Sequence, residues 1–524
     1  MDKRDAEGLS LLKKGRRGLV HLLFSRLGII VLLLLIKLAV ITGFFIYFKD
    51  YSQYYFIVNL VLSVSVFFHI INSSKIEPVS KLTWLFVISV MPLFGSLLYW
   101  YIKKDIGFNA LKYRLANILD ETDNTIHQTE EDICNLKKEN SSVATLADYL
   151  NRTGHHPVYS NTKVEYFPLG EDKFRKMLAE LRRAEKFIMM EYFIVDEGIM
   201  WGRILEILAE KAAQGVEVMV MYDGSNEFTT LPRDYPRRLA KLGIKCKVFA
   251  PATPFISTHY NYRDHRKILV IDGKTAFTGG VNLADEYINA YEKYGHWKDT
   301  AIMLKGPAVK SFTLMFLQMW NITGRQAEYE KYICADILQH NAGGYIIPYG
   351  DSPLDNEKVG KMVYMDIINR ADRYLYIMSP YLILDGDLET ALKFAAARGV
   401  DVKIILPGIP DKKVPYALAK THYSSLVSAG VKIYEYTPGF VHAKVFISDD
   451  QKAVVGTINL DYRSLYHHFE CAAFMYRTDC LPDIVRDFEA TLTKCRQVTD
   501  ESIKKEKLTT KILGSTMKIL APLM

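Results

Sequence analysis

The chain has 524 residues, of which 49% are hydrophobic and 24% are charged, a composition that excludes an intrinsically disordered protein. Its net charge of +7 is small for this length and argues against a nucleic-acid binder, which concentrates basic side chains. The six cysteines form no CxxC pair and no cluster with histidine, so neither a zinc site nor a dense disulfide framework is expected.

Three long apolar segments occupy the N-terminal fifth of the chain, at about residues 28–48, 54–71 and 82–102. Each is about as long as the ~20 helical residues that cross a bilayer, so we expect an N-terminal α-helical transmembrane region and a multi-pass protein of the cell membrane. The basic leader before the first segment favours a cytoplasmic N-terminus. Pro92 and Gly95 interrupt the third segment, which leaves two crossings with a re-entrant hairpin as the alternative to three.

The globular part that follows the membrane region repeats itself. The elements expected in the first half are strands at Phe187–Tyr192, Val216–Tyr222, Cys246–Ala250 and Ile268–Ile271, with a helix at Ile204–Ala213. This order predicts parallel strands with helical crossovers, hence an α/β/α repeat. The repeated region begins with the string RRAEKFIMMEYFIV (182–195) in the first half and with the matching string NRADRYLYIMSPYLIL (369–384) in the second.

Two such repeats predict one catalytic unit around a pseudo-twofold axis, with a site at the seam that receives equivalent residues from both halves. The expected domains are a leader with membrane helices (1–105), a polar connector (106–156), a first repeat (157–335), a second repeat (336–496) and a C-terminal tail (497–524).

One string, H-x-K-x4-D-x6-G-x2-N, ends each repeat and carries the candidate catalytic residues. If His and Lys lie on a strand, side chains two apart share a face, where imidazole and ammonium make a phosphate site. Gly permits a tight turn, and Asn adds an amide donor. The residues are His265, Lys267, Asp272, Gly279 and Asn282 in the first half, and His442, Lys444, Asp449, Gly456 and Asn459 in the second.

This duplicated string resembles the HKD signature of the phospholipase D superfamily over about residues 157–496. The resemblance implies catalysis without metal or cofactor, with His265 as nucleophile and His442 as acid and base. It also implies that both lysines and both asparagines hold the phosphate oxygens, that Asp272 and Asp449 support the motif, and that Asp299 and Glu470 orient the histidines. A Ser often follows the motif glycine in this family, but Gly280 and Thr457 stand there in this chain.

The segment KLTWLFVISVMPLFGSLLYWYIKKD (81–105) and the ending KILAPLM resemble bacterial cardiolipin synthases. That resemblance implies transfer of a phosphatidyl group between two phosphatidylglycerol molecules, anionic phospholipids as partners and no nucleic acid. The alternatives are a phospholipid hydrolase or nuclease with the same chemistry, and a non-catalytic scaffold, which the two intact motifs disfavour.

Two further features of the sequence lead to expectations. His265 lies 22 residues after Gly243, whereas His442 lies 12 after Gly430, so the loop 250–264 is longer than its counterpart. We expect its aromatic and apolar residues to shape a lipid entrance. The pairs His155–His156 and His467–His468 lack a Cys or carboxylate cluster at ligand spacing and are expected to be surface or core histidines.

Overall fold

The computed structural model describes residues 39, 42–43, 52–74, 76, 78–103, 106–251, 262–324, 327–333, 339–355 and 357–523. These residues form two compact units. The large unit comprises described residues between 110 and 515, and the small unit comprises those between 52 and 109 together with 516–523. Most of the predicted lipid-entrance loop, residues 252–261, lies outside the described part of the chain.

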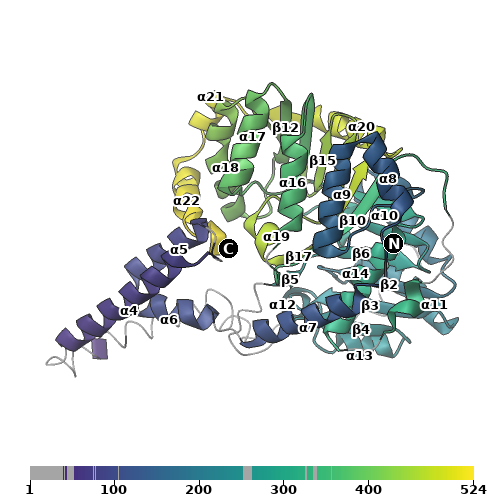
Figure 1. Ribbon diagram of the computed structural model, residues 1–524, viewed down its shortest axis with the longest axis horizontal. Coiled ribbons are helices and arrows are strands. Elements are labelled where there is room, and N and C mark those ends of the chain that lie inside the picture. Colours follow the sequence, from purple (N-terminus) through teal and green to yellow (C-terminus); the bar gives the residue numbers. More distant parts are fainter. Residues whose placement is uncertain are drawn as a thin grey trace. The chain divides into compact units, whose positions relative to one another are not determined.

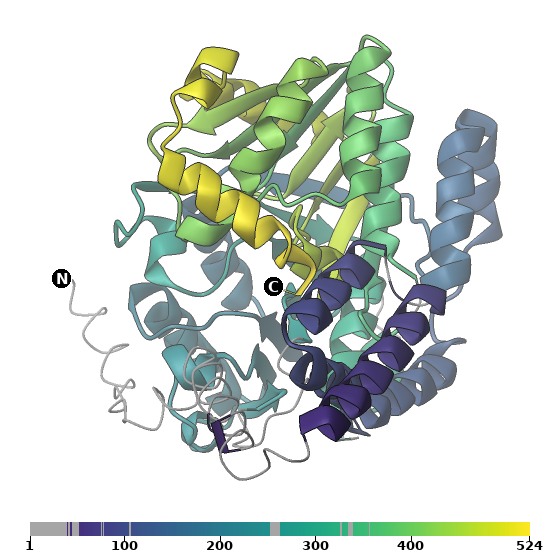
Figure 2. The ribbon, with the colours of Figure 1, turned by 90° about the vertical axis from the view of Figure 1, so that its left-hand side faces the viewer.

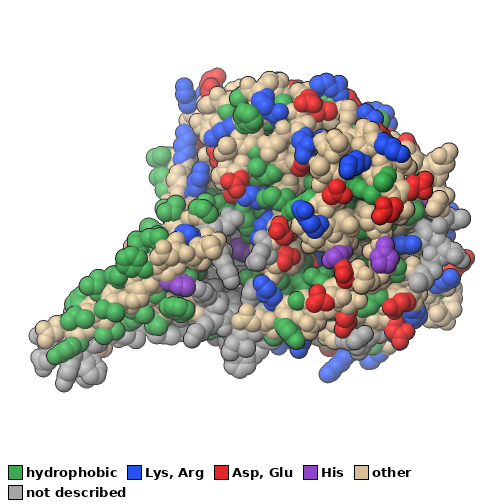
Figure 3. Space-filling model, in the orientation of Figure 1, with side chains coloured by type: hydrophobic (Ala, Val, Ile, Leu, Met, Phe, Trp, Pro, Cys, Tyr) green, Lys and Arg blue, Asp and Glu red, His purple; other side chains and the backbone are tan. Residues whose placement is uncertain are grey.

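The small unit consists of α4 (Ser52–Asn72), α5 (Pro78–Val90), α6 (Pro92–Lys103) and the 3-10 turn η4 (Ala521–Leu523). Its small core is formed by Val66, Ile70, Trp84, Ile88 and Tyr99. The Thr83 hydroxyl donates a hydrogen bond to the carbonyl of Ile519 at 2.8 Å, which ties the C-terminus to α5. Many apolar side chains along α4 stay exposed, as the green surface of these helices in Figure 3 illustrates.

The predicted transmembrane region is wrong for the residues that the structure describes, because none of their helices is both long and apolar enough to span a membrane. The run 82–102 is divided at Met91 into α5 of 13 residues and α6 of 12, each about 20 Å long against a hydrocarbon core of about 30 Å. The run 54–71 lies in α4, a helix of 21 residues. The same finding contradicts the predicted multi-pass location in the cell membrane. The run 28–48 lies outside the described residues except for 39, 42 and 43.

Three helices connect the N-terminal segment to the repeats: α7 (Ile106–Thr122), α8 (Glu130–Glu139) and α9 (Ser141–Gly154). The side chain of Asn140 caps α9 by accepting hydrogen bonds from the N–H groups of Ser142 and Val143. The buried face of α9 joins the core of the second repeat.

The first repeat contains a seven-stranded sheet in the order β1-β9-β7-β6-β2-β3-β4, of which β2, β3 and β4 are parallel. The four predicted strands and the helical crossover between the first two are confirmed, but β6 runs antiparallel to β2, so the expectation of parallel strands is wrong for Ile268–Ile271. The elements are β1 (Lys163–Phe167), α10 (Gly170–Leu181), β2 (Phe187–Tyr192), α11 (Ile199–Ala213), β3 (Glu217–Asp223), α12 (Asn226–Thr229), α13 (Tyr235–Ala240), β4 (Lys245–Phe249), β5 (Arg263–Asp264), β6 (Lys267–Ile271), β7 (Thr275–Gly279), η3 (Asp285–Ile288), β8 (His296–Lys298), β9 (Ala301–Lys305), α14 (Val309–Ile322) and α15 (Tyr329–Ile333).

The second repeat contains the corresponding sheet in the order β10-β17-β16-β15-β11-β12-β13, extended at one edge by β18. Its elements are β10 (Tyr345–Asp351), α16 (Val359–Asn369), β11 (Tyr374–Met378), α17 (Gly386–Ala397), β12 (Asp401–Pro407), α18 (Lys413–Ser428), β13 (Lys432–Tyr436), β14 (Gly439–Val441), β15 (Val445–Ser448), β16 (Lys452–Gly456), α19 (Tyr462–Tyr466), β17 (His468–Tyr476), α20 (Leu481–Leu492), β18 (Cys495–Gln497), α21 (Asp500–Lys504) and α22 (Leu508–Lys518).

The duplicated α/β fold is thus confirmed, and the two repeats lie side by side in both ribbon views (Figures 1 and 2). Two short strand pairings join the repeats. Strand β8 of the first half pairs with β14 of the second, and β5 of the first pairs with β17 of the second. These two exchanges come directly before the two motif histidines, so they fix the seam at which the histidines meet.

Candidate active site

His265 follows the short strand β5 and precedes β6, and the other repeat holds both its backbone and its side chain. Its N–H donates to the carbonyl of Phe469 on β17 at 2.9 Å. Its Nδ1 lies 2.9 and 3.0 Å from the two carboxylate oxygens of Glu470. The ring of Phe193 contacts the imidazole edge-on, with centroids 4.8 Å apart. The buried ring is therefore fixed in one orientation, with Nδ1 turned to the carboxylate.

His442 occupies the equivalent position after β14. Its N–H donates to the carbonyl of Lys298 on β8 at 2.7 Å, and its Nδ1 lies 2.6 Å from Oδ2 of Asp299. The rings of Tyr287 and Trp297 pack against the imidazole at centroid distances of 5.3 and 5.5 Å. Both motif histidines thus have a carboxylate on Nδ1, which leaves Nε2 as the ring atom for chemistry.

The carboxylates are exchanged between the repeats. Glu470 of the second half orients His265 of the first, and Asp299 of the first half orients His442 of the second. The sequence singled out both acids as orienting groups without indicating which histidine each contacts. One consequence is that neither half contains both a motif histidine and the carboxylate that orients it, so the site requires both repeats.

The motif lysines lie just inside the two histidines. Lys267 is the first residue of β6, and Lys444 precedes β15, so the expectation that His and Lys share a strand is wrong: the histidines lie in the connections. Each ammonium donates to the carbonyl of its own motif histidine. Both side chains are fully buried, and burial lowers the pKa of Lys267 to about 8 and that of Lys444 to about 7. A bound phosphate anion would offset this cost of burial and favour the charged form of both lysines.

Burial also lowers the pKa of the histidines. The pKa of His265 falls well below its usual value because the ring is buried, with a further contribution from the positive charge of Lys267. Burial and Lys444 lower the pKa of His442 to about 4, although Asp299 opposes this. Both rings are therefore neutral near pH 7. A bound phosphodiester anion would raise both pKa values.

The two motif asparagines differ in their surroundings. Asn282 accepts from the N–H of Ile194 at 3.0 Å and donates to the Tyr287 hydroxyl at 2.9 Å. Asn459 is buried, and its Oδ1 has no hydrogen-bond partner among the described residues. Asn282 therefore binds Tyr287, whose ring packs against His442. The Asn459 oxygen has no such partner among the described residues.

Asp272 and Asp449 do not contact the histidines. Each follows its strand in the left-handed conformation. Asp272 accepts hydrogen bonds from the N–H groups of residues 185, 186 and 187, and Asp449 accepts from those of residues 372, 373 and 374. Burial opposes the charge on Asp449, but its three N–H donors lower its pKa below the usual value. The two aspartates fix the starts of β2 and β11.

The residue after each motif glycine lies against the carboxylate that orients a motif histidine. The Thr457 hydroxyl donates to Glu470. At Gly280, a Cβ would collide with the carboxylate of Asp299, so no larger residue fits without moving it. The preceding Gly279 has a φ of +141°, and a Cβ there would approach Cα of Ala301 to 2.5 Å. The absent hydroxyl at 280 therefore follows from the close approach of Asp299.

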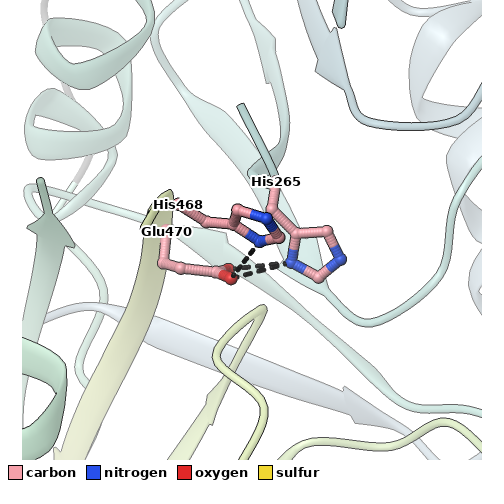
Figure 4. Close-up of side chains that lie close together, drawn as sticks. All are labelled: His265, His468 and Glu470. Atoms are coloured by element: carbon pink, nitrogen blue, oxygen red, sulfur yellow. Dashed lines mark hydrogen bonds and ion pairs between the residues drawn. The ribbon is translucent and has the colours of Figure 1, made fainter. Parts of the chain in front are cut away.

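Sequence reasoning missed His468 and the aromatic rings around the site. His468 lies at the start of β17, buried, with its ring centroid 5.4 Å from that of His265 (Figure 4). Its spacing of two from Glu470 on a strand, which places both side chains on one face, was the signal that could have found it. The five described cysteines are free thiols, and Cys334 lies outside the described residues.

The two repeats and their paired motifs define a protein of the phospholipase D superfamily. A family profile described as "Cardiolipin synthase, PLD-like domain" matches residues 177–320 and 364–492, and one described as "Phospholipase_D-nuclease N-terminal" matches residues 61–104. The chain belongs to the cardiolipin synthase family, and it is accordingly an enzyme of the phosphatidyltransferase class.

Individual relatives agree with this assignment. A protein called cardiolipin synthase from Geobacillus sp. is 33% identical over 89% of this chain and 93% of its own length. Cardiolipin synthase 2 of Bacillus cereus is 34% identical over 86% and 87%. An uncharacterized protein of Streptococcus mutans is 58% identical over 86% and 98%. The crystal structure of phosphatidylserine synthase from Haemophilus influenzae has a TM-score of 0.57 at 14% identity, covering 74% of this chain and all of that one, which supports the fold alone.

Proposed function

We propose that this enzyme makes cardiolipin and glycerol from two molecules of phosphatidylglycerol through a phosphohistidine on His265. The observation that carries the proposal is the pair of buried histidines, each held through Nδ1 by a carboxylate from the other repeat. The names of the relatives support the choice of product.

In the first step, Nε2 of His265 attacks the phosphorus of one phosphatidylglycerol. A P–N bond forms, the P–O bond to glycerol breaks, and the imidazolium of His442 protonates the departing glycerol oxygen. Glu470 stabilises the positive charge that develops on His265. Lys267 and Lys444 offset the charge on the non-bridging oxygens, and Asn459 donates through its amide.

In the second step, the neutral His442 removes a proton from the free glycerol hydroxyl of a second phosphatidylglycerol. That oxygen attacks phosphorus, the P–N bond breaks, and cardiolipin is released with His265 restored. A phosphodiester is broken and another made, so no nucleotide is consumed. Asp299 stabilises the imidazolium of His442 at the moment when it holds the proton.

The test is product analysis of the purified protein with labelled phosphatidylglycerol in detergent and without nucleotide. The proposal predicts equal amounts of cardiolipin and free glycerol, and loss of both in His265→Ala. The matched control is His422→Ala, since His422 is also a buried histidine with a glutamate partner (Glu389, 2.8 Å) but lies on α18. Phosphatidic acid as the sole lipid product would show that water is the acceptor and would overturn the transfer reaction.

A further inference from the structure

A third buried imidazole lies beside the His265–Glu470 pair. His468 and Glu470 lie two residues apart on β17, and Nδ1 of His468 is 3.7 Å from a carboxylate oxygen of Glu470 (Figure 4). His468 is 7% exposed, and neither of its ring nitrogens has a hydrogen-bond partner among the described residues. Burying such a group unsatisfied costs about 1–3 kcal/mol. The proposed transfer reaction assigns it no role, so its position suggests a ligand.

The three side chains have the composition and spacing of a metal site. One ligand atom each from His265, His468 and Glu470 lies within 4.8 Å of the others, and all three residues are buried. Two imidazoles and one carboxylate are a set that Zn²⁺ prefers, and three protein ligands leave a fourth position open.

We propose that His265, His468 and Glu470 form an inhibitory site for a divalent transition-metal ion of the Zn²⁺ type. The ion binds Nδ1 of His265, whose proton then moves to Nε2, or it binds Nε2 directly. In both cases the electron pair that would attack phosphorus is withdrawn. The ammonium of Lys267, which donates to the carbonyl of His265, repels the ion, so we expect weaker binding than at a structural zinc site. Inhibition rests on the proposed role of His265, whereas binding of the ion does not.

The test uses the full chain after treatment with EDTA. Zn²⁺ binding is measured by calorimetry, Co²⁺ binding by its visible absorption, and cardiolipin formation with and without Zn²⁺. The variant is His468→Asn, which keeps a polar side chain, and the control is His467→Asn, its neighbour in sequence. We expect the wild type and the control to bind one ion, to lose activity and to recover it with EDTA. We expect His468→Asn to turn over without metal and to bind Zn²⁺ about 100-fold more weakly.

Thermal unfolding shows whether each variant is folded and gives a second measure of binding, because an ion that binds only the native state raises Tm. Zn²⁺ should raise the Tm of the wild type and of His467→Asn, but not that of His468→Asn. Equal inhibition of His468→Asn, activation by Zn²⁺, or normal turnover with no binding of either ion would each overturn the metal site. Metal binding by a wild type that makes no cardiolipin would support the site and overturn the proposed function instead.

Discussion

Replacing Glu470 by Gln tests the exchanged carboxylates most severely, because the change is nearly isosteric. The Thr457 hydroxyl donates to one oxygen of Glu470 and would select the amide oxygen of Gln. The NH₂ group then faces Nδ1 of His265 at about the distance where the carboxylate lies now, 2.9 Å. Nδ1 must accept, so the proton moves to Nε2 and the nucleophilic electron pair is lost.

The expected loss follows from two contributions. A hydrogen bond to a charged group contributes about 1.5–3 kcal/mol, and holding the wrong tautomer adds a comparable cost, for a total of about 3–6 kcal/mol. At about 1.4 kcal/mol per tenfold, phosphohistidine formation should slow by about 10²–10⁴. The assay is a single-turnover measurement of glycerol release from labelled phosphatidylglycerol.

The matched control is Glu435→Gln, which changes another buried glutamate that pairs with Lys420 and Arg496 and does not contact a motif histidine. It should keep wild-type turnover while losing some stability. Glycerol release by Glu470→Gln within about threefold of wild type would refute the reasoning, because a fold-change that small is less than 1 kcal/mol.

Three further predictions follow from the site. His442→Ala should lose turnover of phosphatidylglycerol but release p-nitrophenol from a phosphatidyl ester with one burst per enzyme, since this leaving group needs no acid; no burst would contradict the assignment of His442. Lys444 has its pKa lowered to about 7 by burial, so it carries its charge below that pH and the KM for phosphatidylglycerol should rise between pH 7 and 9; Lys444→Gln should have a flatter profile. Between about pH 7 and 10, Lys444 is protonated in the unfolded chain but not in the folded one. The free energy of unfolding should therefore rise with pH over that range, as urea unfolding would measure. Asp272→Ala removes the acceptor of three backbone N–H groups and should lower the free energy of unfolding by about 2–4 kcal/mol; loss of activity without loss of stability would contradict its structural role.

The repeat and the motif were readable from the sequence because both rest on local patterns. The predicted strand Ile268–Ile271 is a continuous apolar run, and the string from His265 to Asn282 recurs with identical spacing. The exchange of Glu470 and Asp299 between the halves was not readable, since it depends on which strands cross the seam. The pairings of β5 with β17 and of β8 with β14 involve only two and three residues each, too few to leave a sequence pattern.

The N-terminal prediction failed for a different reason. Hydropathy counts residues in a window, whereas the length of a helix depends on the backbone, and α5 ends at Val90 before Pro92 opens α6. From the sequence, His468 is expected to be a surface or core histidine because no Cys or carboxylate cluster at ligand spacing accompanies the pair His467–His468, although Glu470 lies two residues further on. In the structure, His468 and Glu470 both lie on strand β17 and their side chains share one face of it.

The central claim is that His265 becomes covalently bound to phosphorus, and trapping that adduct tests it most directly. Quenching His442→Ala with alkali after mixing with a p-nitrophenyl phosphatidyl ester, followed by peptide mass spectrometry, locates the modified residue. The phosphohistidine route predicts an acid-labile phosphatidyl group on His265 and none in His265→Ala. An adduct on another residue, or product formation with no adduct at any time, would contradict it.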